Sequence, residues 1–178
     1  MLLENKNAVI YGGGGVIGGA VAHAFAREGA TVHLAGRTLP RLEKVADEIR
    51  AAGGAVETAQ VDAFDEDKVD EHANSVVASG GRLDISFNII SHPDHMGTPV
   101  VEMRYEEFEE PVTRRLRTMW ITSRAAARHM IEQGSGVILT YGGTATRCRT
   151  TGGSRYRSAR SRRCGAPCPV SSGRRACG

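Results

Sequence analysis

The sequence predicts an α/β fold with three layers, in which helices cover both faces of a parallel sheet. Two observations predict it. Segments with strand and helix periodicity alternate roughly every 25 residues, and the glycine run 12–15 separates the first strand-like segment from the first helix-like one. A strand followed by a helix and a second strand builds a right-handed crossover between parallel strands, which places the helices on the faces of the sheet.

Five short segments have the composition of strands. Each is rich in Val, Ile, Leu or Thr, and a helical pattern separates each from the next. In chain order they are residues 8–11, 31–35, 56–61, 83–90 and 137–141.

Helices are expected over residues 16–28, 39–52, 66–78 and 105–133. Apolar residues recur at helical spacing in the first two, and Gly29 and Gly53 follow them as stop signals. The last segment is one long helix or a helix broken at Pro111, because proline removes a backbone donor. This order of strands and helices predicts a Rossmann-type architecture.

The glycine run matches the pattern G-x-G-x-x-G through Gly13, Gly15 and Gly18. In that pattern two glycines let the backbone turn tightly and approach a pyrophosphate, and the third lets the helix pack close to the strand. The start of the helix offers unpaired N–H groups and a partial positive charge to phosphates. The pattern alone is weak evidence, but its place between a strand and a helix favours a dinucleotide-binding turn.

The end of the second predicted strand bears on the choice of dinucleotide. An NAD site usually has an acidic residue about 20 residues after the loop, whereas an NADP site needs a cation for the 2′-phosphate. Here Gly36 is followed by Arg37, and no carboxylate lies between Thr31 and Leu42. NADP is therefore favoured over NAD, with an ordinary solvated loop arginine as the alternative interpretation of Arg37.

Residues 5–146 resemble the short-chain dehydrogenases/reductases at several motifs in the family's order. The loop YGGGGVIGG resembles the cofactor loop, although Val16 stands where the family has its middle glycine, and VHLAGR resembles the NADP-preferring second strand. DISFN resembles the start of the fourth-strand motif, and TSRAAARHMIEQGSGVIL resembles the long interface helix and fifth strand. The resemblance implies cofactor contacts, with the acidic position on the adenine side, from Gly12, Gly13, Gly15, Ile17, Gly18, Arg37, Asp62, Ala63 and Asn88.

The same resemblance implies an activity and partners. The activity would be hydride transfer between NADPH and a ketone or alcohol, as in 3-oxoacyl reductases, on a small-molecule substrate. Homo-oligomers would form through the long helix 105–133. A complete member has further strands, so that here the C-terminal strands are missing, and the fifth strand and long helix are expected to present apolar surface.

The catalytic Ser/Tyr/Lys set of that family is not recognisable in this sequence. The serine position falls on Gly143, the asparagine of the long helix falls on Arg115, and Ile89 replaces an asparagine of the fourth-strand motif. Tyr156 and Arg160 mimic the tyrosine and lysine spacing, but an arginine cannot readily act as the lysine does. The catalytic residues are therefore unknown, and a non-catalytic dinucleotide-binding or regulatory protein remains an alternative, as does the inactive product of a frame-shifted gene.

The last part of the chain differs sharply in composition from the rest. Residues 147–178 hold nine arginines, all four cysteines and no Asp or Glu, so their formal charge is +9, whereas the preceding 146 residues carry 14 basic and 20 acidic side chains. The chain thus divides into an incomplete Rossmann domain, residues 1–146, and an Arg/Cys-rich tail that is disordered or out of frame.

Three interpretations of the tail compete. Clustered arginines suit a basic arm that binds nucleic acid. The four cysteines would suit a metal site, but they contain no C-x-x-C pair. A GC-rich gene translated out of register gives the same composition, and permitted codons for residues 159–178 encode an amphipathic helix, a Gly-Pro stop and a strand start in a shifted frame. The third interpretation is favoured, so neither a metal nor nucleic-acid binding is expected.

The N-terminal sequence MLLENKNAV lacks the regions of a signal peptide, and no run of 18 apolar residues occurs. We therefore expect no membrane span and a cytoplasmic protein with reduced cysteines.

Overall fold

The computed structural model describes residues 1–91, 98–99 and 101–141; the predicted tail and the predicted serine position at Gly143 lie outside them. The described part alternates strands and helices throughout. In chain order the elements are β1 (Asn7–Tyr11), α1 (Val16–Arg27), β2 (Thr31–Gly36), α2 (Leu39–Ala51), β3 (Val56–Gln60), α3 (Glu66–Gly80), β4 (Ile85–Asn88), α4 (Tyr105–Glu132) and β5 (Val137–Thr140).

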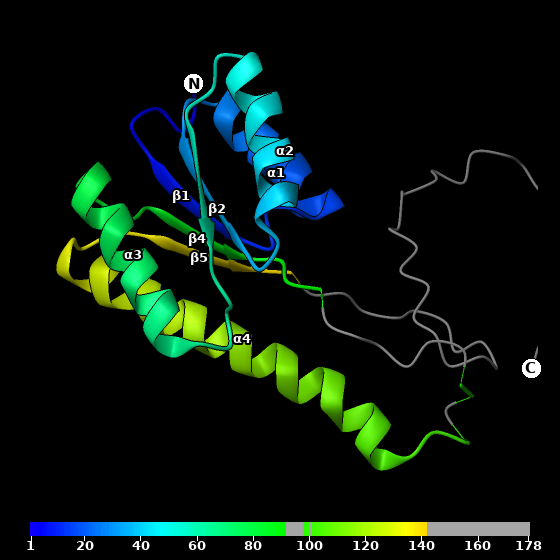
Figure 1. Cartoon of the computed structure of the whole chain (residues 1–178). Helices are drawn as coiled ribbons and strands as arrows, with labels where there is room; N and C mark the ends of the chain where they lie inside the picture. The colour runs from blue at the N-terminus through cyan, green and yellow to red at the C-terminus, as the bar shows by residue number, and fades with distance from the viewer. Residues whose placement is uncertain (92–97, 100, 142–178) are drawn as a thin grey trace, which may run out of the picture.

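The five strands form one parallel sheet in the order β3-β2-β1-β4-β5. Helices α1 and α2 cover one face, and α3 and α4 cover the other (Figure 1). The chain reverses its direction of winding between β1 and β4, which is the position where open α/β sheets bind ligands. The predicted Rossmann-type fold with three layers is confirmed.

Two hydrophobic clusters fill the spaces between the sheet and its helices, and strand β1 contributes residues to both. Its residues Ala8 and Ile10 pack toward α1 and α2, whereas Val9 and Tyr11 pack toward α3 and α4. Successive side chains of a strand point to opposite faces, so a strand buried on both sides has a continuous apolar sequence. This explains why the sequence of a buried strand such as β1 is a short apolar run.

Strand β4 is shorter at both ends than the expected segment 83–90. At its start, the backbone N–H of Leu83 donates to the side chain of Gln133 at 3.2 Å. Past its end, the N–H of Ile90 donates to the side chain of Asn88, also at 3.2 Å. Side chains occupy the donors that a longer strand would give to its neighbours, so the ladder stops early.

Helix α4 is continuous, so the alternative of a break at Pro111 is wrong. Pro111 lies in the second turn, where its missing N–H removes a single hydrogen bond of the helix. The rest of the helix is held by packing against α3 and the sheet through Thr118, Ile121, Thr122, Ala125, Ala126 and Met130. No helix in the described part of the chain is long and apolar enough to cross a membrane.

The edge strand β5 is exposed along its whole length. Val137 is 51% exposed, and Ile138 and Leu139 are each 39% exposed. The expectation of apolar surface on this strand is therefore confirmed, and an exposed apolar edge invites pairing with other chains.

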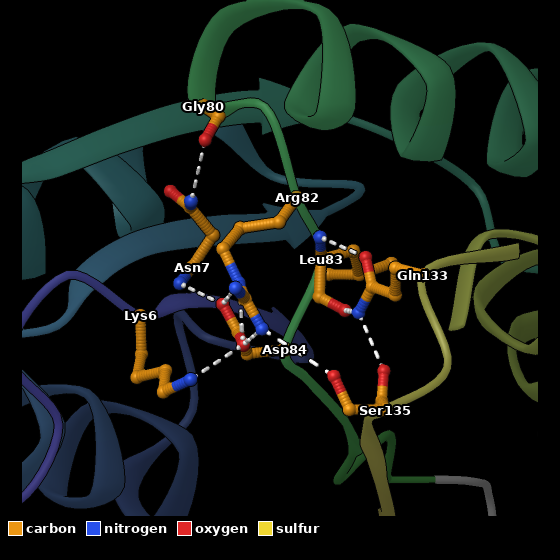
Figure 2. A network of polar contacts seen from close by, with 8 residues as sticks. All are labelled: Lys6, Asn7, Gly80, Arg82, Leu83, Asp84, Gln133 and Ser135. Carbon is orange, nitrogen blue, oxygen red and sulfur yellow. Dashed lines mark hydrogen bonds and ion pairs between the residues drawn. The ribbon is translucent and has the colours of Figure 1, made fainter. Parts of the chain in front are cut away.

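Asp84 lies at the amino edge of the sheet, just before β4, with only 6% of its surface exposed. Its carboxylate accepts hydrogen bonds from Arg82 Nε at 2.7 and 2.8 Å, from Lys6 Nζ at 3.0 Å and from the backbone N–H of Asn7 at 3.0 Å (Figure 2). Burial alone would raise the pKa of Asp84, but these donors outweigh it and hold the pKa below its ordinary value.

The backbone of the same residue joins three strands. The N–H of Asp84 donates to the carbonyl of Asn7 at 2.9 Å, and its carbonyl accepts from the N–H of Val137 at 2.8 Å. Gln133 completes the network, because its amide donates to the carbonyl of Leu83 at 2.6 Å (Figure 2). The starts of β1, β4 and β5 are therefore tied together at one buried residue, through its carboxylate and its backbone.

Two buried histidines lie between the sheet and α3. His33 on β2 is 2% exposed, with Nδ1 3.2 Å from Glu57 and Nε2 3.3 Å from Asn7. His72 on α3 packs edge-on against Tyr11, with ring centres 6.0 Å apart. Burial, and secondarily the charge of His33, lowers the pKa of His72 to about 4. Burial also lowers the pKa of His33, against the opposing effect of Glu57.

We expect Asp84→Asn to destabilise the fold strongly, because the change leaves the cations Arg82 and Lys6 without their shared anion. The free energy of unfolding, measured with urea, should fall by about 2 to 3 kcal/mol. The matched control is Asp47→Asn, since Asp47 has a side chain that is 74% exposed and pairs with Arg50 on the same helix. Equal losses in the two variants would contradict the role of the network.

We expect the buried His72 to make stability depend on pH. The folded pKa of about 4 lies below the ordinary value of 6.5, so the unfolded chain takes up the proton first as pH falls. The contribution is fully present above pH 6.5 and is lost toward pH 4, at up to about 1.4 kcal/mol per pH unit. His72→Gln should flatten this part of the pH dependence in urea titrations, and an unchanged slope would refute the assignment.

Candidate functional site

A cleft opens at the carboxyl ends of the strands, at the point where the strand order reverses. Its volume is about 270 Å³. Its walls come from the glycine loop, the ends of β2 and β3, the segment after β4 and one side of α4. The lining residues are Tyr11, Gly12, Gly14, Gly15, Ala35, Gly36, Arg37, Thr38, Arg41, Leu42, Val61, Asp62, Ala63, Phe64, Ile89, Ile90, Ser91, Arg114 and Thr118.

The glycine loop forms the floor of this cleft by close backbone contacts. Gly12 has φ +92°, a conformation that favours glycine, and its N–H donates to the carbonyl of Ala35 at 2.8 Å. A Cβ on Gly13 would lie 2.7 Å from the side chain of Leu34 and 3.2 Å from the carbonyl oxygen of Ile10, so glycine relieves crowding on this side of the loop. The backbone therefore borders the cleft with no Cβ in the way.

Helix α1 starts directly at the loop and is held there by its own glycine. A Cβ on Gly18 would lie 2.3 Å from the carbonyl oxygen of Gly12, so only glycine allows the helix to sit this close. Gly15 is the N-cap, and no acidic side chain occupies the first turn. The helix thus presents uncompensated N–H groups beside the loop, which suits an anion.

A basic wall faces the loop across the cleft. The structure places Arg37, Thr38 and Arg41 there, at the end of β2 and the start of α2. Among the described residues that line the cleft, three are arginines and only Asp62 is acidic. The cleft therefore favours a ligand that carries several negative charges.

Asp62 and Ala63 follow β3 and border the other end of the cleft. The Asp62 carboxylate accepts the backbone N–H of Phe64 at 3.1 Å, which fixes a tight turn and leaves the carboxylate exposed. Asn88, in contrast, is 6% exposed and donates from its side chain to Thr122 at 3.0 Å. It ties β4 to α4 and does not line the cleft, so its contact with a cofactor stays a prediction.

The structure brings Gly12, Gly15, Arg37, Asp62 and Ala63 of the predicted site together in the cleft wall. Gly13 and Gly18 shape the loop from behind, and Ile17 stands 45% exposed at the start of α1. The roles of all these residues toward a cofactor stay predictions.

Sequence reasoning missed several polar members of the wall, Arg41, Arg114 and Thr118 among them. Arg41 lies four residues after Arg37, in the first turn of α2, so its place near the same strand end could have been predicted from the sequence. Arg114 and Thr118 come from α4, and nothing in their local sequence indicates that the helix passes beside the cleft.

The residues expected near the chemistry are only partly described. Gly143, Tyr156 and Arg160 lie outside the described residues. Arg115 lies on α4, and its carbonyl accepts the hydroxyl of Thr118 at 3.1 Å. Within residues 1–91, 98–99 and 101–141 no group of three His, Cys, Asp or Glu side chains could hold a metal ion.

Comparison with known proteins identifies the family. The model of the short chain dehydrogenase family matches residues 6–162. An uncharacterized oxidoreductase of Bacillus subtilis is 35% identical over 138 residues, which are 78% of this chain and 50% of that protein. An uncharacterized oxidoreductase of Mycobacterium tuberculosis is 31% identical over 159 residues, 89% of this chain and 60% of that protein.

Solved structures agree with the sequence comparisons. A short-chain type dehydrogenase/reductase from Mycobacterium marinum, 33% identical, has a TM-score of 0.67 and is matched over 78% of this chain and 56% of its own. A metagenomic short-chain oxidoreductase in complex with NADP, 29% identical, has a TM-score of 0.72 over 84% of this chain and 67% of its own. The chain belongs to the short-chain dehydrogenase family and spans about half the length of the first of these curated relatives.

We expect Gly18→Ala to distort the glycine loop, because the new Cβ would overlap the Gly12 carbonyl oxygen at 2.3 Å. The free energy of unfolding should fall by about 2 kcal/mol. Gly19→Ala is the matched control, since its Cβ would make an ordinary contact 3.4 Å from Val45 and alanine favours the helix. A stable Gly18→Ala variant would show that the close approach is not required.

Proposed function

We propose that this chain is the dinucleotide-binding part of an NADP-dependent oxidoreductase. One observation carries the proposal: the glycine loop, the start of α1 and the wall formed by Arg37, Thr38 and Arg41 border a single cleft at the reversal of strand order. Phosphates in such a cleft meet unpaired N–H groups and cations.

The residues present fit a dinucleotide. The floor of the cleft is bare backbone at Gly12 and Gly15, and a Cβ on Gly12 would lie 2.8 Å from the carbonyl oxygen of Ile89, so glycine is needed for the backbone to border the cleft this closely. The pyrophosphate would lie on this loop, and Asp62 and Ala63 would border the adenine. Bound NADPH supplies a hydride for a ketone, and we propose a small substrate of the 3-oxoacyl type.

The proposed preference for NADPH over NADH rests on charge. Arg37 follows β2 directly, and no carboxylate faces it from β2 or from the first turn of α2. A 2′-phosphate carries a negative charge that a guanidinium binds in a bidentate manner, whereas the 2′-hydroxyl of NADH would leave Arg37 without a partner there. NADH would consequently bind less tightly.

A second candidate is a dinucleotide-binding protein without catalysis. It is favoured by Arg115 and Ile89, which occupy positions where the family has asparagine. Both residues lie in the described part, and neither side chain can replace a neutral amide that accepts and donates hydrogen bonds. Turnover of a ketone, measured alongside binding, distinguishes the two candidates.

We also propose that the chain pairs with a second copy through α4. Its outer face carries an exposed apolar stripe at helical spacing, composed of Phe108, Val112, Leu116 and Trp120. Phe108 is 61% exposed and Trp120 is 56% exposed. An apolar stripe of this length on a single helix suits a helix–helix interface, and the mass of the particle in solution measures whether one forms.

We expect the wild-type chain to bind NADPH more tightly than NADH, and Arg37→Leu to weaken NADPH binding by about 10- to 100-fold, the value of a lost charged hydrogen bond. Binding of NADH should change by less than about twofold, since the 2′-hydroxyl does not need the cation. Fluorescence titration of the reduced nicotinamide measures both. Arg27→Leu, at the far end of α1, is the control, and tighter binding of NADH by the wild-type chain would refute the preference.

A further inference from the structure

Arg114 reaches the cleft from α4, on the side opposite the wall of Arg37 and Arg41. Its guanidinium carbon lies 4.7 Å from the ring centre of Phe64, so the charged group is held over an aromatic face. Arg117 lies over the same ring at the longer distance of 5.9 Å and does not line the cleft. Two arginines thus gather on one ring, and one of them faces the cavity.

The charge of Arg114 is weakly compensated by the protein. Among the described residues, the one carboxylate within 4 Å of its guanidinium is that of Glu110, at 3.9 Å, and the side chain of Glu110 is 56% exposed. Within the described part of the chain, its buried Nε has no hydrogen-bond partner. Other arginines of the same helix are better paired: Arg124 lies 3.0 Å from Glu66, and Arg128 lies 2.7 Å from Asp70. The ion pair of Arg114 is therefore longer than those of Arg124 and Arg128.

The surroundings of Arg114 suit a planar base better than a phosphate. Phe64 and Ala63 give this end of the cleft an apolar surface, and the exposed carboxylate of Asp62 lies two residues from Phe64. A phosphate here would be repelled by Asp62, whereas an exocyclic amine can donate to that carboxylate. A guanidinium plane supported on one face by an aromatic ring can stack on a base with the other.

We propose that Arg114 recognises the adenine base, with its guanidinium stacked between Phe64 and the base. This inference rests on the proposed function, since it places the adenosine end of the dinucleotide beside Asp62. Arg114 is then a binding residue for the base, distinct from Arg37, which acts on the 2′-phosphate. Its effect is the same for NADPH and NADH, because both carry adenine.

The test compares Arg114→Leu with Arg117→Leu, which removes the neighbouring arginine over the same ring. Arg114→Leu should weaken the binding of NADPH and of NADH by the same factor, about 10-fold. Reduced nicotinamide mononucleotide, which lacks adenine, should bind as it does to the wild type. Arg117→Leu should change the affinity for NADPH, NADH and the mononucleotide by less than about twofold each. Thermal unfolding of each variant controls for loss of fold.

Three results would overturn the inference: equal affinities of the two leucine variants, loss of NADPH binding with NADH unchanged, or full rescue by Arg114→Lys. The second result would assign Arg114 to the 2′-phosphate. The third would show that a positive charge is sufficient and that the planar guanidinium is not needed. The proposed function fails separately if the wild type binds neither dinucleotide. In that case the binding of adenosine monophosphate to the wild type and to both leucine variants is measured by NMR titration. Weaker binding to Arg114→Leu, with binding to Arg117→Leu unchanged, supports the adenine contact. Equal binding to all three proteins, or no binding to any of them, refutes it.

Discussion

The buried carboxylate of Asp84 is the constraint on which the sheet depends. It lies at the amino edge, where a charge removed from water costs several kcal/mol unless it is paired and hydrogen-bonded. Arg82, Lys6 and the N–H of Asn7 supply those partners, and they come from the start of β1 and from the turn before β4. Any shift of one strand against its neighbour would break several of these bonds at once, so the register of β1 and β4 is fixed.

The register at the amino edge determines what meets at the carboxyl edge. Because β1 and β4 are aligned with Tyr11 opposite Asn88, the loop after β1 and the segment after β4 emerge side by side. The Gly12 to Gly18 contact then directs the start of α1 toward the same point. A cleft with N–H groups on its floor and arginines on its walls follows from the packing of these elements.

The exposed surfaces of the domain are as informative as its core. Helices α1 and α2 cover β1 and β2 on one side of the sheet, but strand β5 lies beyond these helices. Its apolar side chains Val137, Ile138 and Leu139 therefore stay accessible to solvent. The outer stripe of α4 is exposed in the same way. The cost of leaving both surfaces in water is about 25 cal/mol for each Å² of apolar area, which a partner would recover by covering them.

The sequence by itself determined the order of the elements and most of their bounds, because hydrophobic periodicity and glycine stops are local signals. It also located Gly12, Gly15, Arg37 and Asp62 at the cleft, since strand ends of a parallel sheet share one edge. Only the tertiary structure decided that α4 passes straight through Pro111 and that β4 ends early. Both depend on packing and on side-chain bonds between segments far apart in the chain. For the same reason Arg114 could not be found from sequence: it lies 51 positions after Ala63, and only the passage of the first half of α4 beside the turn after β3, where Arg114 lies over Phe64, brings the two to one cavity.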